Sequence, residues 1–322
     1  VFISIKPRFG DFLPNLIKQN IKNKLKKYAV AGIVPEILDL KYLYVEIHSS
    51  VYYNTNLAPS ADSIGTLVSD NTKKYADSSD LNKYGARFKY SKFLNIIDNS
   101  SDAVTSNITK VYMRRDLRIA VNSFAEYAIG FGNAFHVKRA SGYNIKSSAF
   151  KINGIDQTVY LSDLPNNDLK TGSLFFFTLP SLNSKTPTIV RRNVGTIDYQ
   201  AGIVILNPVN ITDGKEKDGQ KIIEISTSPL SNDVIGLQDL YLQLDISNSA
   251  FDMIIDEISS GLDPSASSYI VSSSYDTGNL VRSGGPVTSS IDSVTTSSAG
   301  VPSTTTATTS SSTTTSTTST SS

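Results

Sequence analysis

The sequence predicts an α+β fold: an N-terminal α/β sandwich with a mixed sheet, then a β-dominated domain, then a Ser/Thr-rich tail. Three observations support this prediction. Helix-spaced and strand-spaced apolar runs alternate in the first region, strand-like runs between turn residues dominate the second, and Ser303 to Ser322 are all Ser or Thr except Ala307. A chain of 322 residues suits two ordinary domains. We therefore predict domains at 1–118 and 119–270 and a low-complexity extension at 271–322.

The first region begins with a strand-like run at residues 1–5, which Pro7 closes. From Asp11 onwards, apolar residues recur every three or four positions, and this spacing gathers them on one face of a helix. Gly32 is placed to end that helix. Lys24 falls inside the apolar arc, and we expect its ammonium group to reach solvent. The residues of the arc are Leu13, Ile17, Ile21, Leu25 and Tyr28.

The rest of the first region alternates between the two periodicities. Residues 33–40 and 43–53 are β-rich, and a tight reversal near residues 39–41 would make them a hairpin. Residues 60–75 and 91–97 are predicted to be helices, and residues 108–114 are predicted to be the last strand of the region. This order predicts a small α/β sandwich with its helices on one face of a mixed sheet.

The second region contains strand-like runs that turn residues separate. A hairpin turn at residues 198–202 leads into a buried strand at 203–206, and Asn207-Pro208 and Asp213-Gly214 indicate loops. One helix is expected around residues 249–258. The predicted strands are 172–179, 188–194, 196–206 and 221–226.

Composition limits the classes of function. The net charge of +1 gives no field that favours nucleic acid or an anionic membrane. The chain has no Cys, which removes disulfides, thiolate metal sites and Cys nucleophiles. The most apolar stretch, residues 173–180, is too short to span a bilayer, and no signal-peptide pattern is visible. Since the chain starts at Val1 and enters a strand at once, we expect it to be a piece of a longer protein.

Candidate chemical sites are weak. His48 and His136 lack neighbours at metal-ligand spacing, and Gly130-x-Gly132 lacks the third glycine of a dinucleotide-binding turn. Residues 213–219 are acidic, but lysines interrupt them, so a solvated hairpin is expected there rather than a calcium loop. We therefore predict no catalytic, cofactor-binding or metal-binding residue, no cofactor, and no enzyme activity.

Two further features each leave two interpretations open. Lys18, Lys22 and Lys26 lie on one helix face at i, i+4 spacing, either as a solvated face or as a docking stripe for an acidic surface. Residues 175–177 are all Phe, so at least one ring lies on each face of their strand. That strand is either covered within the chain or covered by a partner.

A resemblance to a known family rests on the order and spacing of several short pieces. They include residues 1–7, Leu13-Pro14, 34–39, 42–47, 87–94, 96–98 and, more loosely, 194–202. Together they resemble the baseplate J-like wedge proteins of contractile-tailed phages, and above all the C-terminal half of the T-even-type wedge subunits, the gene-six products. The resemblance is densest over residues 1–118. The Ser/Thr tail adds nothing to it.

The resemblance implies an architectural role. Such proteins pair within each wedge and link wedges into the inner-baseplate ring around the central hub, and this ring rearranges during sheath contraction. The partners implied are another copy of the chain, giving a homodimer, other wedge proteins, and nearby hub and sheath-initiating proteins. The location implied is the tail baseplate of a virion, made late and assembled in the host cytoplasm. No nucleic acid or membrane is implied as a partner.

Two alternatives come from other classes. The tail and the sequons at Asn99, Asn107 and Asn210 suggest a secreted or wall-attached adhesin with an O-glycosylated tail. A tail-associated polysaccharide-processing enzyme would need two carboxylates about 5–10 Å apart. Asp198 and Asp252 are available residue types, but nothing in the sequence brings them together.

Overall fold

The computed structural model describes residues 1–7, 13–30, 32–58, 60–138, 143–179 and 187–262, together with the backbone of 275–276 and 279–280. The described part is mostly β-structure with three helices. The chain forms two compact units, residues 1–254 and 255–322. Of the predicted extension at 271–322, only the short strands β18 (Tyr275–Asp276) and β19 (Asn279–Leu280) are described. The rest of the predicted tail lies outside the described residues.

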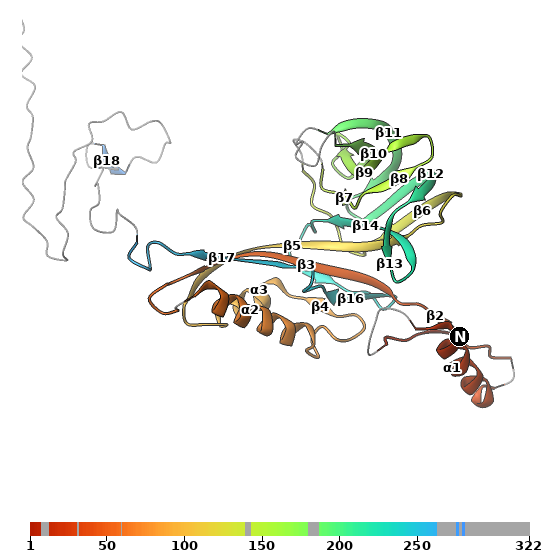
Figure 1. Ribbon diagram of the computed structural model, residues 1–322, viewed down its shortest axis with the longest axis horizontal. Helices are drawn as coiled ribbons and strands as arrows, with labels where there is room; N and C mark the ends of the chain where they lie inside the picture. Colours follow the sequence, from red (N-terminus) through yellow and green to blue (C-terminus); the bar gives the residue numbers. More distant parts are fainter. Residues whose placement is uncertain are drawn as a thin grey trace, which may run out of the picture. The chain divides into compact units, whose positions relative to one another are not determined.

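A mixed sheet of long strands forms the centre of the first unit (Figure 1). Its order is β13-β14-β5-β3-β16, with β17 also paired to β3 and β7 to β14. β3 and β16 run parallel, whereas β5 is antiparallel to both β3 and β14. The strands are β3 (Lys41–Tyr53), β5 (Val104–Arg118), β7 (Lys146–Ser147), β13 (Lys215–Lys217), β14 (Gln220–Thr227), β16 (Leu240–Leu244) and β17 (Ala250–Ile255).

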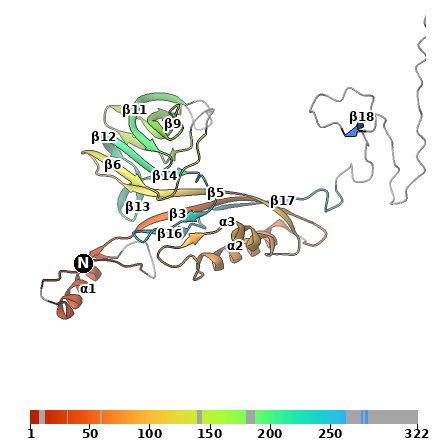
Figure 2. The same ribbon diagram turned by 180° about the vertical axis from the view of Figure 1, so that it is seen from behind.

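Helices α2 (Ala61–Ala76) and α3 (Tyr90–Asp98) cover one face of this sheet, as both views show (Figures 1 and 2). The Ser60 hydroxyl accepts a hydrogen bond from the Ser63 amide and so caps the start of α2. A short two-stranded antiparallel sheet of β4 (Arg87–Phe88) and β15 (Val234–Ile235) lies on the same side. The apolar side chains that α2 and α3 bury are Ile64, Val68, Tyr75, Phe93 and Ile97.

A second sheet stands on the other face (Figures 1 and 2). Its pairings run from β8 through β9, β10 and β11 to β12 and back to β8, so five strands form a closed ring, and β6 pairs with β12. The ring and the long sheet share one continuous apolar core. The strands are β6 (Phe124–Gly130), β8 (Phe150–Ile152), β9 (Ile155–Pro165), β10 (Thr171–Thr178), β11 (Thr188–Asp198) and β12 (Ile203–Asp213).

The N-terminal residues form a small module of their own, which we define as residues 1–7 and 13–38. Strands β1 (Phe2–Ser4) and β2 (Glu36–Leu38) pair in parallel. Helix α1 (Asn15–Tyr28) connects them and packs against β2. In both views α1 lies apart from α2 and α3 (Figures 1 and 2).

Several predicted elements are confirmed. The first strand, the helices at 60–75 and 91–97, and the strands at 43–53, 108–114, 172–179 and 221–226 match β1, α2, α3, β3, β5, β10 and β14. The turn at 198–202 is also confirmed, because β11 and β12 pair on either side of it. Helix α1 exists but begins at Asn15 and ends at Tyr28, before the expected stop at Gly32. The coarse class, mainly β with some helices, is thus correct.

Four predictions are wrong. Residues 33–40 do not form a hairpin with β3, because β2 pairs with β1 and the neighbours of β3 are β5, β16 and β17. Residues 249–258 include a strand, β17, in which half-buried Phe251 and Met253 alternate with exposed Asp252. Residues 196–206 span the end of β11, a turn and the start of β12. Asn207-Pro208 is a bulge inside β12, where the pairing with β6 shifts register.

The sequence patterns did not identify β6, β8, β9 or β16. Strand β8 has only three residues, and a five-residue buried run such as β16 is ambiguous between helix and strand. The predicted domain limits, 1–118, 119–270 and 271–322, stay predictions.

Candidate interaction site

The residues considered for metal or acid–base chemistry lie apart. His48 is exposed on β3, with its ring edge-on to Tyr112, whereas His136 follows β6 and bonds through its backbone amide to Ser228. Asp198 accepts hydrogen bonds from the amides of its own turn, and Asp252 is exposed on β17 of the other sheet. No group of three or more His, Asp or Glu side chains in the described part of the chain is placed to hold a metal.

The acidic segment at residues 213–219 is a hairpin, as predicted. Strands β13 and β14 pair across a turn at Asp218 and Gly219, which both have positive φ. Asp213 forms an ion pair of 3.1 Å with Lys221. This neighbour and the Gly214 amide hold the pKa of Asp213 below its ordinary value.

The Phe run is covered within the chain. Phe175 and Phe176 are buried, and Phe176 meets Phe150 edge-on across the ring. Phe177 stacks on Tyr160 of the neighbouring strand β9. Of the two interpretations left open, the buried core strand is therefore the correct one.

A buried ionic cluster, which the sequence analysis did not identify, joins four strands of the long sheet. Arg114 on β5 is 5% exposed and pairs with Glu46 on β3 at 2.7 Å and with Asp245 after β16 at 2.8 Å. Asp116 on β5 and Glu224 on β14 complete the carboxylates around it, at 3.2 and 3.9 Å. The one available signal was the charged run Arg114-Arg115-Asp116, which begins at the last residue of the strand predicted at 108–114.

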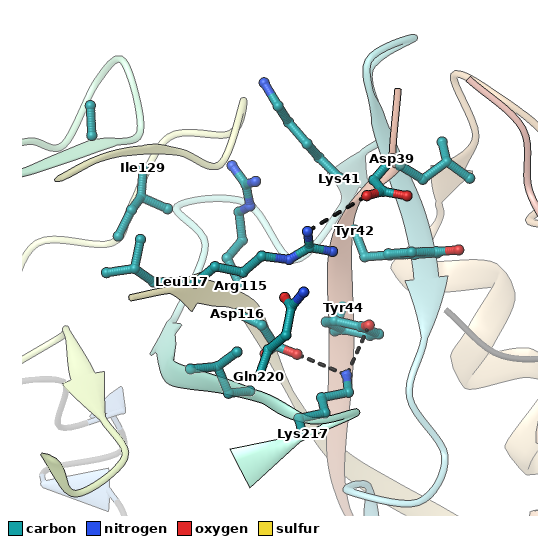
Figure 3. A pocket seen from close by; sticks show the side chains of 14 residues that line it. Asp39, Lys41, Tyr42, Tyr44, Arg115, Asp116, Leu117, Ile129, Lys217 and Gln220 are labelled. Carbon is teal, nitrogen blue, oxygen red and sulfur yellow. Dashed lines mark hydrogen bonds and ion pairs between the residues drawn. The ribbon is translucent and has the colours of Figure 1, made fainter. Parts of the chain in front are cut away.

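A groove of about 360 Å³ opens beside this cluster (Figure 3). It lies between the start of β3, the end of β5, β6 and the β13–β14 hairpin. Tyr42 and Tyr44 form one wall, with stacked rings 5.7 Å apart. Lys217 of β13 donates hydrogen bonds to Asp116 at 2.8 Å and to the Tyr44 hydroxyl at 3.1 Å, as Figure 3 shows.

Several charged groups of the groove pair within the chain. Asp39 lies 3.7 Å from Arg118 and also 2.6 Å from Lys18 of α1, so it ties the N-terminal module to the sheet. Arg115 donates to the Gly130 carbonyl, and burial lowers its pKa. Asp39 and Asp116 are thus both paired with basic residues of the same chain, and these ion pairs connect neighbouring strands and α1.

The N-terminal module is different, since much of its apolar surface is uncovered. Helix α1 buries none of its residues. Leu16 is 73% exposed and Tyr28 is 88% exposed. The other exposed large apolar residues of the module are Val1, Phe2, Ile17, Val30, Ile33, Val34 and Leu38. An apolar surface of this kind indicates a contact site.

The three lysines of the stripe considered on this helix, Lys18, Lys22 and Lys26, do not all have the same surroundings. Lys18 pairs with Asp39 and Lys22 with Glu36, so the acidic surface that meets these two lysines belongs to the chain itself. Lys26 is exposed and makes no ion pair with a described residue. Neither α1 nor any other described helix has the length and apolar character needed to cross a membrane.

Comparison with known proteins finds matches to the first third of the chain. Residues 1–38 match the family model "Baseplate structural protein gp6, C-terminal domain I", and residues 41–116 match that of C-terminal domain III. The baseplate wedge protein gp6 of Enterobacteria phage T4 is 29% identical over 118 residues, which is 36% of this chain and 18% of the relative. The matched part thus covers less than one fifth of the relative's length. The N-terminal third of the chain is thus similar to C-terminal domains of the gp6 baseplate wedge proteins.

Proposed function

We propose that this chain is a structural component of a phage tail baseplate wedge. The observation that carries the proposal is the match of residues 1–38 and 41–116 to C-terminal domains I and III of a baseplate structural protein. In this proposal residues 1–118 form the α/β sandwich of the baseplate J-like kind, and residues 119–270 a β-rich domain. The chain acts through contacts and carries out no catalysis.

The partners follow from the same family. We expect a second copy of the chain, other wedge proteins, and the hub and sheath-initiating proteins close by. Six such wedges would be linked into a ring around the hub, and the contacts between them would rearrange when the sheath contracts. The exposed apolar residues of the N-terminal module support a protein whose surface is completed by partners.

Self-association is tested by light scattering of the full chain over a concentration series. We expect the mass of a dimer that persists on dilution. A monomer at all concentrations would exclude self-association by these residues and would leave pairing to the rest of the protein.

The location is tested separately, by immunogold labelling of intact virions with antibodies raised against residues 187–254. We expect gold at the baseplate end of the tail. Gold on the host envelope, together with O-linked glycans on the tail, would support the adhesin instead, and release of sugars from host-surface glycans would support the enzyme.

A further inference from the structure

We infer that one face of α1 is a docking site for an acidic, apolar surface of a different protein. The inference rests on the proposed function, since a wedge component needs such contacts. The α1 face is formed by Leu16, Ile17, Lys24, Lys27 and Tyr28, whose spacing places them on one side of the helix.

The α1 face is the side turned away from the rest of the chain. Ile21 and Leu25 are half-buried on the adjoining side, which continues to Lys18 and Lys22 and their ion pairs with Asp39 and Glu36. On the α1 face, Leu16 and Tyr28 are exposed by 73% and 88% and Ile17 by 44%. Removing such apolar side chains from water is favourable, so an apolar counterpart would bind here favourably.

The charge of this face calls for carboxylates. Lys24 and Lys27 lie among its apolar residues, and Lys26, which continues the stripe of Lys18 and Lys22, is on the same turn beside the face. All three are exposed and make no ion pair with a described residue, and α1 contains no acidic residue. Asp39 and Glu36, the two acids that form ion pairs with α1, do so through Lys18 and Lys22. A partner that supplies Glu or Asp beside its apolar side chains complements both properties of the face.

The same charge disfavours three other occupants. A two-fold contact between two α1 faces would bring the lysines of both copies together, and like charges in an interface cost affinity. Nucleic acid offers phosphates but leaves Leu16 and Ile17 without an apolar counterpart. In a bilayer, Lys24 at the centre of the apolar arc would be pulled into the acyl boundary.

The test uses the full chain and three fluorescent helical peptides of about 18 residues, enough for about five turns. All three carry the same leucine stripe, and their other positions are Glu, Gln or Lys. At low salt we expect the Glu peptide to bind about tenfold more tightly than the Gln peptide, with the Lys peptide weakest. Equal binding of all three peptides would overturn the inference.

Variants locate the site. Exchanging Lys24, Lys26 and Lys27 for Glu should weaken binding of the Glu peptide about tenfold or more, and Leu16→Ser with Tyr28→Ser should weaken it at high salt as well. The matched control exchanges Lys83, Lys89 and Lys151, which are also exposed, for Glu. Equal effects of the two triple variants would show that net charge alone drives binding, and would overturn the site. The triple exchange to Gln, which retains helix propensity, guards against misfolding of α1.

Other ligands are offered in competition. Preference for a DNA duplex or for phosphatidylglycerol vesicles over the Glu peptide would overturn the choice of partner. Loss of the dimer mass in the Lys24, Lys26 and Lys27 variant would show that a second copy uses this face, which also contradicts the inference. If gold labelling places the chain away from the baseplate but the Glu peptide still binds, the proposed function fails while the docking site stands.

Discussion

The guanidinium group of Arg114 on β5 lies 2.7 Å from the carboxylate of Glu46 on β3, in the interior of the long sheet. Asp245, Asp116 and Glu224 surround the same guanidinium group, so one cation is shared by four carboxylates from several strands. Their charges raise the pKa of Arg114 in spite of its burial. Such a cluster makes the register of the strands specific, since a shift of one residue would separate the charges.

Replacing Arg114 with Met should therefore destabilise the fold strongly. The variant keeps the volume but leaves four carboxylates without their shared cation, and loss of one partner of a buried pair costs about 3–5 kcal/mol. Urea unfolding followed by circular dichroism measures the change. Arg87→Met is the control, because Arg87 pairs with Asp233 at an exposed site where about 0–1 kcal/mol is expected. Similar losses in the two variants would contradict the role of the cluster.

Glu46→Gln should show how burial acts on this carboxyl group. Burial, the largest cause, and the neighbouring carboxylates raise the pKa of Glu46, although Arg114 lowers it. The folded state thus holds the proton more tightly than the unfolded state, whose pKa is about 4.3. Protonation of Glu46 therefore stabilises the folded state. This contribution is complete below the pKa that Glu46 has in the unfolded chain, and it is lost as the pH rises through the pKa of Glu46 in the folded chain.

The free energy of unfolding of the natural chain should therefore fall relative to the Gln variant from about pH 4.3 upwards. Urea titrations of both proteins at matched pH values give this difference. A difference that is constant with pH, or that grows in favour of the natural chain, would mean that the Arg114 charge outweighs burial at this site.

Tyr199→Phe tests a buried contact of the ring. The Tyr199 hydroxyl donates to the Asp163 carboxylate at 2.6 Å, and Asp163 also accepts from the Ile145 amide. Burial, with the Asp163 hydrogen bond and charge, raises the pKa of Tyr199 far above its ordinary value. Losing one partner of this buried carboxylate should cost about 1–3 kcal/mol. Tyr160→Phe keeps the stacking on Phe177 and should change the unfolding free energy by less than about 0.5 kcal/mol.

Gly202→Ala tests the turn between β11 and β12. Gly202 has a φ of +66°, and a Cβ there would meet the Asn133 carbonyl oxygen at 2.0 Å. Gly219 has a similar φ of +73° but open space around it. Gly219→Ala should cost only the conformational strain of about 1–2 kcal/mol, and Gly202→Ala distinctly more. Equal melting temperatures of the two variants would show that the chain near Asn133 yields without cost.

The spacing of apolar residues along the chain was enough to predict helices and strands in which this spacing is regular. Helix α2 follows its apolar spacing and its Ser60 cap, and β3 and β5 follow their alternation. Pairing between distant segments could not be predicted in this way. Nothing near residues 36–38 shows that they pair with residues 2–4. Tyr44 alternates along β3 with the core residues Leu43 and Val45, yet it is buried too, because Arg114 and Lys217 of β13 lie over its ring. The groove unites four such segments, so sequence patterns did not reveal it.

The place of β5 beside β14 has a consequence for how relatives of this chain can differ. Arg118 and Ile222 are paired neighbours, yet the whole ring of strands is built from the residues between them. The ring is thus an insertion whose two ends leave the sheet side by side, and such an insertion can change in size without altering the order of the strands. The family match ends at residue 116, at the edge of this insertion. Strand β3 and most of β5 lie inside the matched residues and every strand of the ring lies outside them, so we expect relatives to vary more in the ring than in these two strands.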